Sequence, residues 1–257
     1  MKRIGIASLV VFISAFNSGA STAGAGANEP APFSAEMIQK GPQGSMKGKM
    51  YVDGGRMRTE MSQNDQQVIH IVDKDKGVRW MLYPAQQAYI EHRGPVAVTS
   101  ASTKKSSNPC AAMRGAQCKE TGREKFSGRD AVKWEITFSA KGKTQAGYQW
   151  IDAERGIPLR VEMPNGQKME MKLLGMEKLA GRSVEKWEMR AWRGDGAPQR
   201  TFQWYDPKIK LMIREELPNG VVREMVNIRE GRQPDNLFTI PAGFKKMAPP
   251  AGQGRRR

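Results

Sequence analysis

The feature that most constrains the fold of this chain is an internal repeat. A stretch over residues 124–171 recurs over residues 177–225, and the offset is 53 residues up to the first pair of matched tryptophans and 54 afterwards. The matched segments, in order, are Glu124–Arg129 with Glu177–Arg182, Lys133–Glu135 with Lys186–Glu188, Gln149–Asp152 with Gln203–Asp206, and Pro164–Gly166 with Pro218–Gly220. Ordered matches with one single-residue insertion indicate one supersecondary unit used twice, in which each copy covers the apolar surface of the other.

Both copies have the pattern of a β-meander. Val132, Trp134 and Ile136 alternate with polar residues, which is the period of a half-buried strand. The Asn-Gly pairs in Pro164–Gly166 and Pro218–Gly220 predict type I′ hairpin turns. Outside the repeat, the same alternation predicts about six antiparallel strands over residues 33–92 and a closing apolar strand over residues 237–241.

These patterns predict a mainly β fold with little helix. About twelve strands would form a single curved antiparallel sheet, a half-open β-barrel, in which the two copies are neighbouring meanders. We expect one domain over residues 28–247. The Pro/Gly-rich segment over residues 248–257 ends in three arginines and is predicted to be a disordered basic tail.

The N-terminal 27 residues predict export. Lys2 and Arg3 precede a run of about a dozen mainly apolar residues, and small residues lead to Ala25-Gly26-Ala27. This is the pattern of a cleaved signal peptide over residues 1–27. The cleavage point carries no cysteine, so we do not expect a lipoprotein. We therefore expect a periplasmic protein. No later stretch is apolar enough to cross a membrane, so we expect peripheral membrane contact or none.

The chain is strongly basic, with a formal net charge of +16. Such a charge attracts polyanions such as nucleic acid, anionic lipid head groups or acidic protein surfaces, and equally describes a soluble basic surface. Export argues against nucleic acid as a physiological partner.

Two cysteines, Cys110 and Cys118, stand in a loop that we expect over residues 93–123. In an exported protein a close pair of this kind predicts a disulfide, which would hold the loop in place. We also expect one helical turn within the loop, near residues 111–113. A redox site is the alternative, but the spacing is not Cys-x-x-Cys. No His or Cys stands nearby to complete a metal site, so we expect no metal.

We expect no catalytic residues and no cofactor. The chain contains two histidines, and His70 lies in an alternating strand, where it serves as a structural residue or a general base. Nucleophile-elbow, zinc-protease, P-loop and dinucleotide motifs are missing from the sequence.

Methionine and tryptophan are the candidate ligand-binding residues. Methionine is unbranched and polarisable, so it suits surfaces that accept irregular apolar ligands. A single curved sheet has a concave face that must be filled by a lid, by its own side chains or by a ligand. The alternative to ligand binding is that the methionines and tryptophans fill the core of a β protein. The candidates for the concave face are Met50, Met57, Met61, Trp80, Trp134, Trp150, Met169, Met171, Trp187, Met189 and Trp204.

Several segments resemble an exported bacterial family of unknown function that is allied to the periplasmic lipoprotein carriers LolA and LolB. These segments are Lys49–Arg58, the hairpin Trp80–Pro84, Gly128–Glu135 and the closing Phe238–Phe244. The resemblance covers residues 33 to 247. It implies a curved antiparallel half-barrel whose concave face binds acyl chains.

Two functions follow as hypotheses. The first is a non-enzymatic periplasmic carrier for lipid or lipoprotein acyl chains, with lysines and arginines at the rim to steer anionic groups. The second is a cell-envelope interaction or stress-sensor module that binds a protein partner. An enzyme would require a buried cluster of titratable residues, which the sequence does not indicate.

Overall fold

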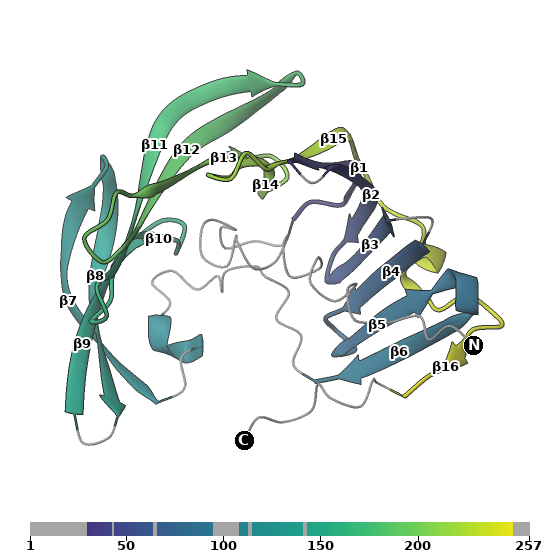
Figure 1. The fold of residues 1–257 in the computed structure, drawn as a ribbon, viewed down its shortest axis with the longest axis horizontal. Coiled ribbons are helices and arrows are strands. Elements are labelled where there is room, and N and C mark those ends of the chain that lie inside the picture. Colours follow the sequence, from purple (N-terminus) through teal and green to yellow (C-terminus); the bar gives the residue numbers. More distant parts are fainter. Residues whose placement is uncertain are drawn as a thin grey trace. The chain divides into compact units, whose positions relative to one another are not determined.

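A computed structural model describes residues 30–42, 44–63, 66–94, 108–112, 115–140 and 143–248 (Figure 1). The expected signal peptide over residues 1–27 lies outside the described residues. So do residues 249–257 of the expected tail and residues 95–107 of the expected loop.

The described residues form sixteen strands in one hydrogen-bonded order, β16-β6-β5-β4-β3-β2-β1-β15-β14-β13-β12-β11-β10-β9-β8-β7. The strands are β1 (Phe33–Gly41), β2 (Gly44–Asp53), β3 (Arg56–Gln63), β4 (Gln66–Asp73), β5 (Val78–Tyr83), β6 (Ala88–Arg93), β7 (Ala116–Phe126), β8 (Arg129–Ala140), β9 (Lys143–Asp152), β10 (Pro158–Glu162), β11 (Gln167–Leu179), β12 (Arg182–Arg193), β13 (Gln199–Asp206), β14 (Leu211–Glu216), β15 (Val222–Glu230) and β16 (Lys245–Lys246). Three short 3-10 helices are η1 (Pro84–Gln86), η2 (Pro109–Ala112) and η3 (Asp235–Phe238).

The expected fold class is confirmed: the chain is mainly β, with one open antiparallel sheet and little helix. The six strands expected over residues 33–92 are β1 to β6, paired antiparallel in chain order. Strand β16 differs, because it runs parallel to β6.

The chain divides into two compact units. The described part of unit 1 lies within residues 99–171 and 191–197, and that of unit 2 within residues 28–98, 172–190 and 198–257. Unit 1 contains β7 to β10, and unit 2 contains β1 to β6 and β13 to β16. Strands β11 and β12 each contribute residues to both units. The single domain expected over residues 28–247 stays a prediction.

One face of β2 to β6 in unit 2 is covered by a C-terminal strap, residues 232–247. Phe238 is 1% exposed and packs against Ile69, Ile71 and Leu82. The Arg58 guanidinium donates to the Leu237 carbonyl at 2.9 Å. We call this side of the sheet the strap face. The apolar strand expected over residues 237–241 is therefore wrong, because residues 235–238 form η3, whose side chains fill the core rather than extend the sheet.

A turn recurs three times, although the repeat is visible only twice in the sequence. Asp73, Asp152 and Asp206 are 1–2% exposed, and each ends a strand and accepts backbone N–H groups of the following turn through its Oδ1 atom. Four residues after each aspartate the backbone has a positive φ, at Gly77 (60°), Gly156 (68°) and Lys210 (59°). The hairpin that follows Asp73 is therefore a third copy of the same turn.

Lys210 offers a test of this equivalence. A side chain in the left-handed region costs about 1–2 kcal/mol relative to glycine, partly offset by the greater entropy that glycine loses on folding. We expect Lys210→Gly to raise the free energy of unfolding by about 0.5–1 kcal/mol, measured by urea denaturation. The matched change Gly156→Lys in the first copy should lower it. A stabilising Gly156→Lys would contradict the equivalence.

The two Asn-Gly turns differ from the expected type I′ geometry. In each, only the glycine has a positive φ (Gly166, 80°; Gly220, 76°), whereas type I′ requires it at both central residues. Gly166 N–H donates to the Met163 carbonyl at 3.0 Å, so the central residues are Pro164 and Asn165. Proline fixes its φ near −65° and moves the turn one residue towards the N-terminus.

The disulfide between Cys110 and Cys118 is confirmed, with the two Cα atoms 5.8 Å apart. It joins η2 to the edge strand β7. The expected loop over residues 93–123 is shorter than predicted, because β7 begins at Ala116. The expected helical turn lies at Pro109–Ala112, close to its predicted place.

Candidate ligand-binding face

The strand register of unit 2 collects methionines on the face opposite the strap. Met50 pairs with Thr59, Thr59 with His70 and His70 with Met81, so their side chains share one side of the sheet. Met37 pairs with Met225 on β15, and on β2 with Gly48, which in turn pairs with Met61. We call this side the methionine face, defined by Met37, Met50, Met57, Met61, Met81 and Met225.

Gly48 lets two of these side chains lie close to the backbone. A Cβ atom there would come within 2.7 Å of Met61 Sδ and 3.1 Å of Met37 Cε. The thioethers therefore lie over the glycine. Met37, Met50 and Met225 are buried, whereas Met57, Met61 and Met81 are half-buried. The half-buried set is the accessible part of the methionine face.

A polar row crosses this face beside the methionines. Gln203 Nε2 donates to Glu215 Oε1 at 3.0 Å, and Arg223 Nη1 lies 3.2 Å from Glu215 Oε2. Arg223 Nε also donates to Gln39 Oε1 at 3.0 Å. These residues pair across β13, β14, β15 and β1, so the row runs perpendicular to the strands. We call Gln39, Gln203, Glu215 and Arg223 the polar row.

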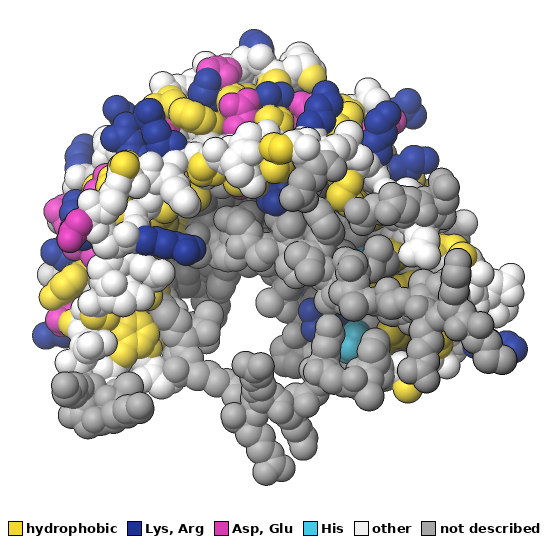
Figure 2. All heavy atoms as spheres, in the orientation of Figure 1, with side chains coloured by type: hydrophobic (Ala, Val, Ile, Leu, Met, Phe, Trp, Pro, Cys, Tyr) yellow, Lys and Arg dark blue, Asp and Glu magenta, His cyan; other side chains and the backbone are white. Residues whose placement is uncertain are grey.

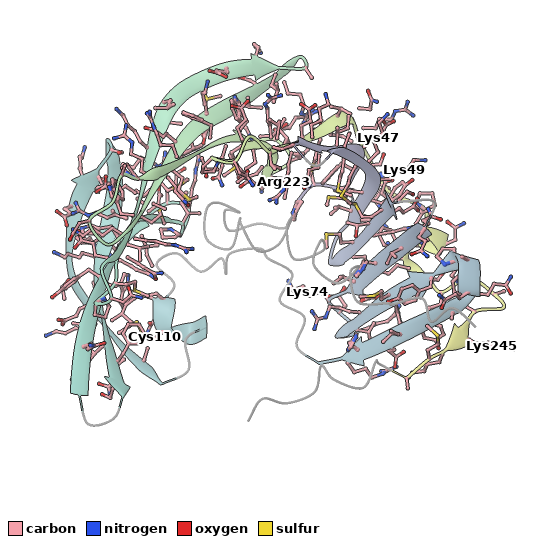
Figure 3. All side chains as sticks on the ribbon, in the orientation of Figure 1. Lys47, Lys49, Lys74, Cys110, Arg223 and Lys245 are labelled. Carbon is pink, nitrogen blue, oxygen red and sulfur yellow. A yellow bond between two sulfur atoms is a disulfide. The ribbon has the colours of Figure 1, made fainter. Side chains whose placement is uncertain are left out.

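Figure 3 shows that Arg223 and the two lysines Lys47 and Lys49 leave opposite sides of the sheet in unit 2. This agrees with the register, because Lys47 pairs with Ile38, the neighbour of Met37 and Gln39. In Figure 2, lysines and arginines alternate with acidic residues over β12 to β15. Arg214, for example, contacts Glu216 at 2.7 Å and Glu224 at 2.8 Å, so much of the basic charge there is paired.

The candidate residues of unit 2 divide between the two faces. Met50, Met57 and Met61 lie on the methionine face. Trp80 pairs with Ile71 on the strap face, where it packs against the cluster around Phe238. Trp204 pairs with Arg214 and shares its side with Lys186, whose Nζ is 5.0 Å from the ring centroid. Trp187 and Met189 therefore face the other way, on the side of the methionine face.

The candidates of unit 1 divide in the same way. Trp134 pairs with Gln149 and Gln149 with Val161, which pairs with Met169. Met171, which is fully buried, follows Met169 on the same side. Trp150 lies on the other side of the sheet, where it pairs with Lys133 on β8 and with Arg160 on β10.

The tryptophans of the Gln-Trp strands form a repeated structural contact. Lys133 Nζ and the Arg160 guanidinium lie 4.8 and 4.9 Å from the Trp150 ring centroid, on a ring that is 6% exposed. Its Nε1 donates to Glu124. Trp204 has equivalent partners in Lys186, Arg214 and Glu177. Stacked cations cover both rings, so Trp150 serves packing within unit 1 and Trp204 serves packing within unit 2.

The candidates therefore do not share one face within either unit: in unit 2, Trp80 and Trp204 lie on the other side of the sheet from Met50, Met57 and Met61, and in unit 1 Trp150 lies on the other side from Trp134, Met169 and Met171. Side chains alternate strictly along a strand, so one residue of register decides the face. Register depends on turn and bulge geometry, and β9–β10 and β13–β14 both contain a register shift. The sequence pattern does not reveal those shifts.

Sequence reasoning missed Met37, Met81 and Met225 and the whole polar row. A signal for the row exists in the repeat. At the offset of 54 residues, Glu215 and Arg223 replace Val161 and Met169, so the second copy has charges where the first is apolar. Glu185, at the offset of 53, likewise replaces Val132 and accepts from Trp187 Nε1 at 3.0 Å.

His70 is a half-buried, neutral part of the methionine face. Burial, together with the nearby charge of Arg79, lowers the pKa of His70 to about 4. Its Nε2 atom is buried and has no hydrogen-bond partner within the part of the chain that the structure describes. The unfolded chain therefore binds a proton at higher pH than the folded protein does.

This difference predicts a pH dependence of stability. The contribution of neutral His70 to the stability of the fold is fully present above the unfolded-state pKa of 6.5. It is lost as the pH falls towards 4, because between these two pH values the histidine is protonated only in the unfolded state. We expect the folded protein to lose about 2 kcal/mol between pH 7 and pH 5 through His70. His70→Gln, which copies Gln149 and Gln203 three residues before the other two aspartates, should remove that loss in urea titrations. Equal slopes in both proteins would contradict this prediction.

Within the described ranges, no group of three or more His, Cys, Asp or Glu side chains could hold a metal ion. The described part of the chain has no helix that is long and apolar enough to span a membrane.

Comparisons with known proteins give structural likeness only. No protein family and no characterised protein matches the sequence. Similar solved structures include a LolA superfamily protein from Nitrosomonas europaea, 12% identical over 82% of this chain and 90% of that chain (TM-score 0.34). An uncharacterised conserved protein from Thermus thermophilus is 10% identical over 85% and 90% (0.32), and a chain of the Pseudomonas aeruginosa MucA/MucB complex is 12% identical over 79% and 94% (0.21). LolA-superfamily proteins, which the sequence resembles, are thus among the similar solved structures, and TM-scores of this size carry no assignment of function.

Proposed function

We propose that the chain is an exported, non-enzymatic binding protein that takes up apolar chains of a lipid or a lipoprotein on the methionine face of unit 2. The observation that carries this proposal is the collection of six methionines on one side of β1 to β5 and β15. Flexible thioether side chains adapt to apolar ligands of irregular shape. Gly48 adds to this by letting Met37 and Met61 lie against the backbone.

Export is part of the proposal. The predicted signal peptide would direct the chain to the periplasm, where acyl chains must be shielded from water to move between membranes. N-terminal sequencing of the exported protein should find Asn28 as its first residue. An N-terminus at Met1 would contradict cleavage.

Binding can be tested with a fluorescent fatty acid and the delipidated, exported protein. We expect saturable uptake, together with lipid detected by native mass spectrometry before delipidation. Met57→Gln combined with Met61→Gln should weaken uptake about tenfold, because each replaces apolar contact worth roughly 0.8 kcal/mol per buried methylene. The matched control is Met176→Gln on β11, a methionine that is 58% exposed. Absence of both co-purified lipid and uptake would refute the proposal.

The alternative is a cell-envelope interaction or stress-sensor module that binds a protein partner. One observation favours it: Leu174 and Met176 on β11 are 45% and 58% exposed, and such side chains mark interaction sites when they cluster. The same variants separate the two functions. A stoichiometric protein partner that is lost in Met176→Gln and retained in the Met57/Met61 variant, with no lipid bound, would favour the alternative.

A further inference from the structure

The two copies of the repeat build the same hairpin with different chemistry. In unit 1, Val161 faces Met169 across β10 and β11, and in unit 2 Glu215 faces Arg223 across β14 and β15. Both hairpins turn at Pro-Asn-Gly. The fold therefore does not require charges at these two positions.

Stability does not explain the charges either. Glu215 and Arg223 are 14% and 12% exposed, so both are largely removed from water. Replacing a buried ion pair by apolar residues of similar volume is often neutral or stabilising. The pair is also held in place from both sides, by Gln203 on β13 and by Gln39 on β1. A positioned ion pair on an apolar face is the arrangement expected of a binding site.

Gln203 adds an independent observation. It is fully buried, and its Oε1 atom has no hydrogen-bond partner among the described residues. The orientation of its amide follows from chemistry, because the atom that faces the Glu215 carboxylate must be the donor Nε2. The remaining Oε1 is an acceptor that lacks a donor, which buried polar groups rarely do.

The polar row borders the methionines directly. Arg223 and Met225 lie two residues apart on β15, and Gln39 and Met37 lie two residues apart on β1. Two residues along a strand correspond to about 7 Å. An amphiphile on this face would therefore place its head beside the polar row and its chain towards the half-buried Met61.

We propose that the polar row is a head-group site for an amphiphile whose head donates a hydrogen bond through a hydroxyl or an amide N–H. This inference rests on the proposed function. Gln203 Oε1 would accept that hydrogen bond, and the Glu215–Arg223 pair would hold Gln203 in position. Because Glu215 neutralises Arg223, the row offers no net positive charge to a bare carboxylate.

The test compares three probes that carry the same acyl chain: monolauroylglycerol, N-methyl dodecanamide and methyl dodecanoate. The first donates through hydroxyls, the second through an amide N–H, and the third has no donor. Binding to the delipidated protein is measured by displacement of the fluorescent fatty acid. We expect at least one donor probe to bind about tenfold more tightly than methyl dodecanoate. The tighter of the two donors identifies the source, a lipid hydroxyl or an acylated amine.

The matched variant is Glu215→Val with Arg223→Met, which installs the pair found in the first copy. It leaves no buried charge unpaired, so we expect it to fold. Its preference for a donor head should disappear. Equal binding of all three probes to the unaltered protein, or a full preference in the variant, would overturn the head-group site alone. Failure of every probe to bind would instead refute the proposed function.

Discussion

Replacing Asp206 by alanine should lower the free energy of unfolding by about 3–5 kcal/mol, the loss expected when one partner of a buried ion pair is removed. Asp206 is 1% exposed and accepts from the Arg182 guanidinium. Its other oxygen accepts from the backbone N–H groups of Lys208 and Ile209 at 2.8 and 3.3 Å. The variant would leave these donors without their acceptor.

Urea denaturation measures this loss, and three variants define its origin. Asp206→Asn keeps an acceptor for the turn but removes the charge, so its loss should be smaller, about 1–2 kcal/mol. Asp152→Ala removes the equivalent contact with Arg129 in the first copy and should cost a similar amount. The double variant Arg182→Ala with Asp206→Ala should lose less free energy of unfolding than the sum of the losses in the two single variants. A loss below about 1 kcal/mol for Asp206→Ala would show that this contact does not stabilise the hairpin.

Replacing Phe238 by alanine should cost about 3–5 kcal/mol, as expected for a buried phenylalanine. Its ring packs on Ile69, Ile71 and Leu82, and the Arg56 guanidinium carbon lies 4.6 Å from its centroid. The loss would loosen η3 from the strap face. Trp80 packs against the same cluster, so its fluorescence should shift to the red as water reaches it.

A nearby exposed contact is the control for this variant. Asp235 accepts from Arg56 at 2.7 Å but is 82% exposed, so Asp235→Ala should cost less than about 1 kcal/mol. The Trp80 signal is isolated by comparison with Trp80→Phe. Equal losses for Phe238→Ala and Asp235→Ala would mean that the strap is held by charge rather than by its buried ring.

Much of the local structure could be predicted from the sequence. The alternation over Phe33, Ala35 and Met37 places β1, and the six strands that it begins are present. The pair Cys110 and Cys118 forms its disulfide. These features depend on residues close in the chain, whose spacing the sequence states directly.

The third copy of the turn could not be seen in the same way. Around Asp73 the chain keeps the aspartate and the positive φ four residues later, but few other residues of the repeat. Backbone conformation is shared there without sequence similarity, because glycine and lysine both occupy the left-handed position. Only the structure makes Gly77 and Lys210 equivalent.

From the residue pattern alone, this chain could be predicted to be a β protein with a duplicated meander and many methionines. Tertiary structure decided which side of the sheet each residue faces. In unit 2 it placed Trp80 and Trp204 on the side opposite the methionine face, and it brought Gln39 from β1 beside Arg223 from β15, 184 residues away. The physical reason is that side chains alternate at every residue, so strand pairing between distant segments, which local spacing does not encode, sets the faces.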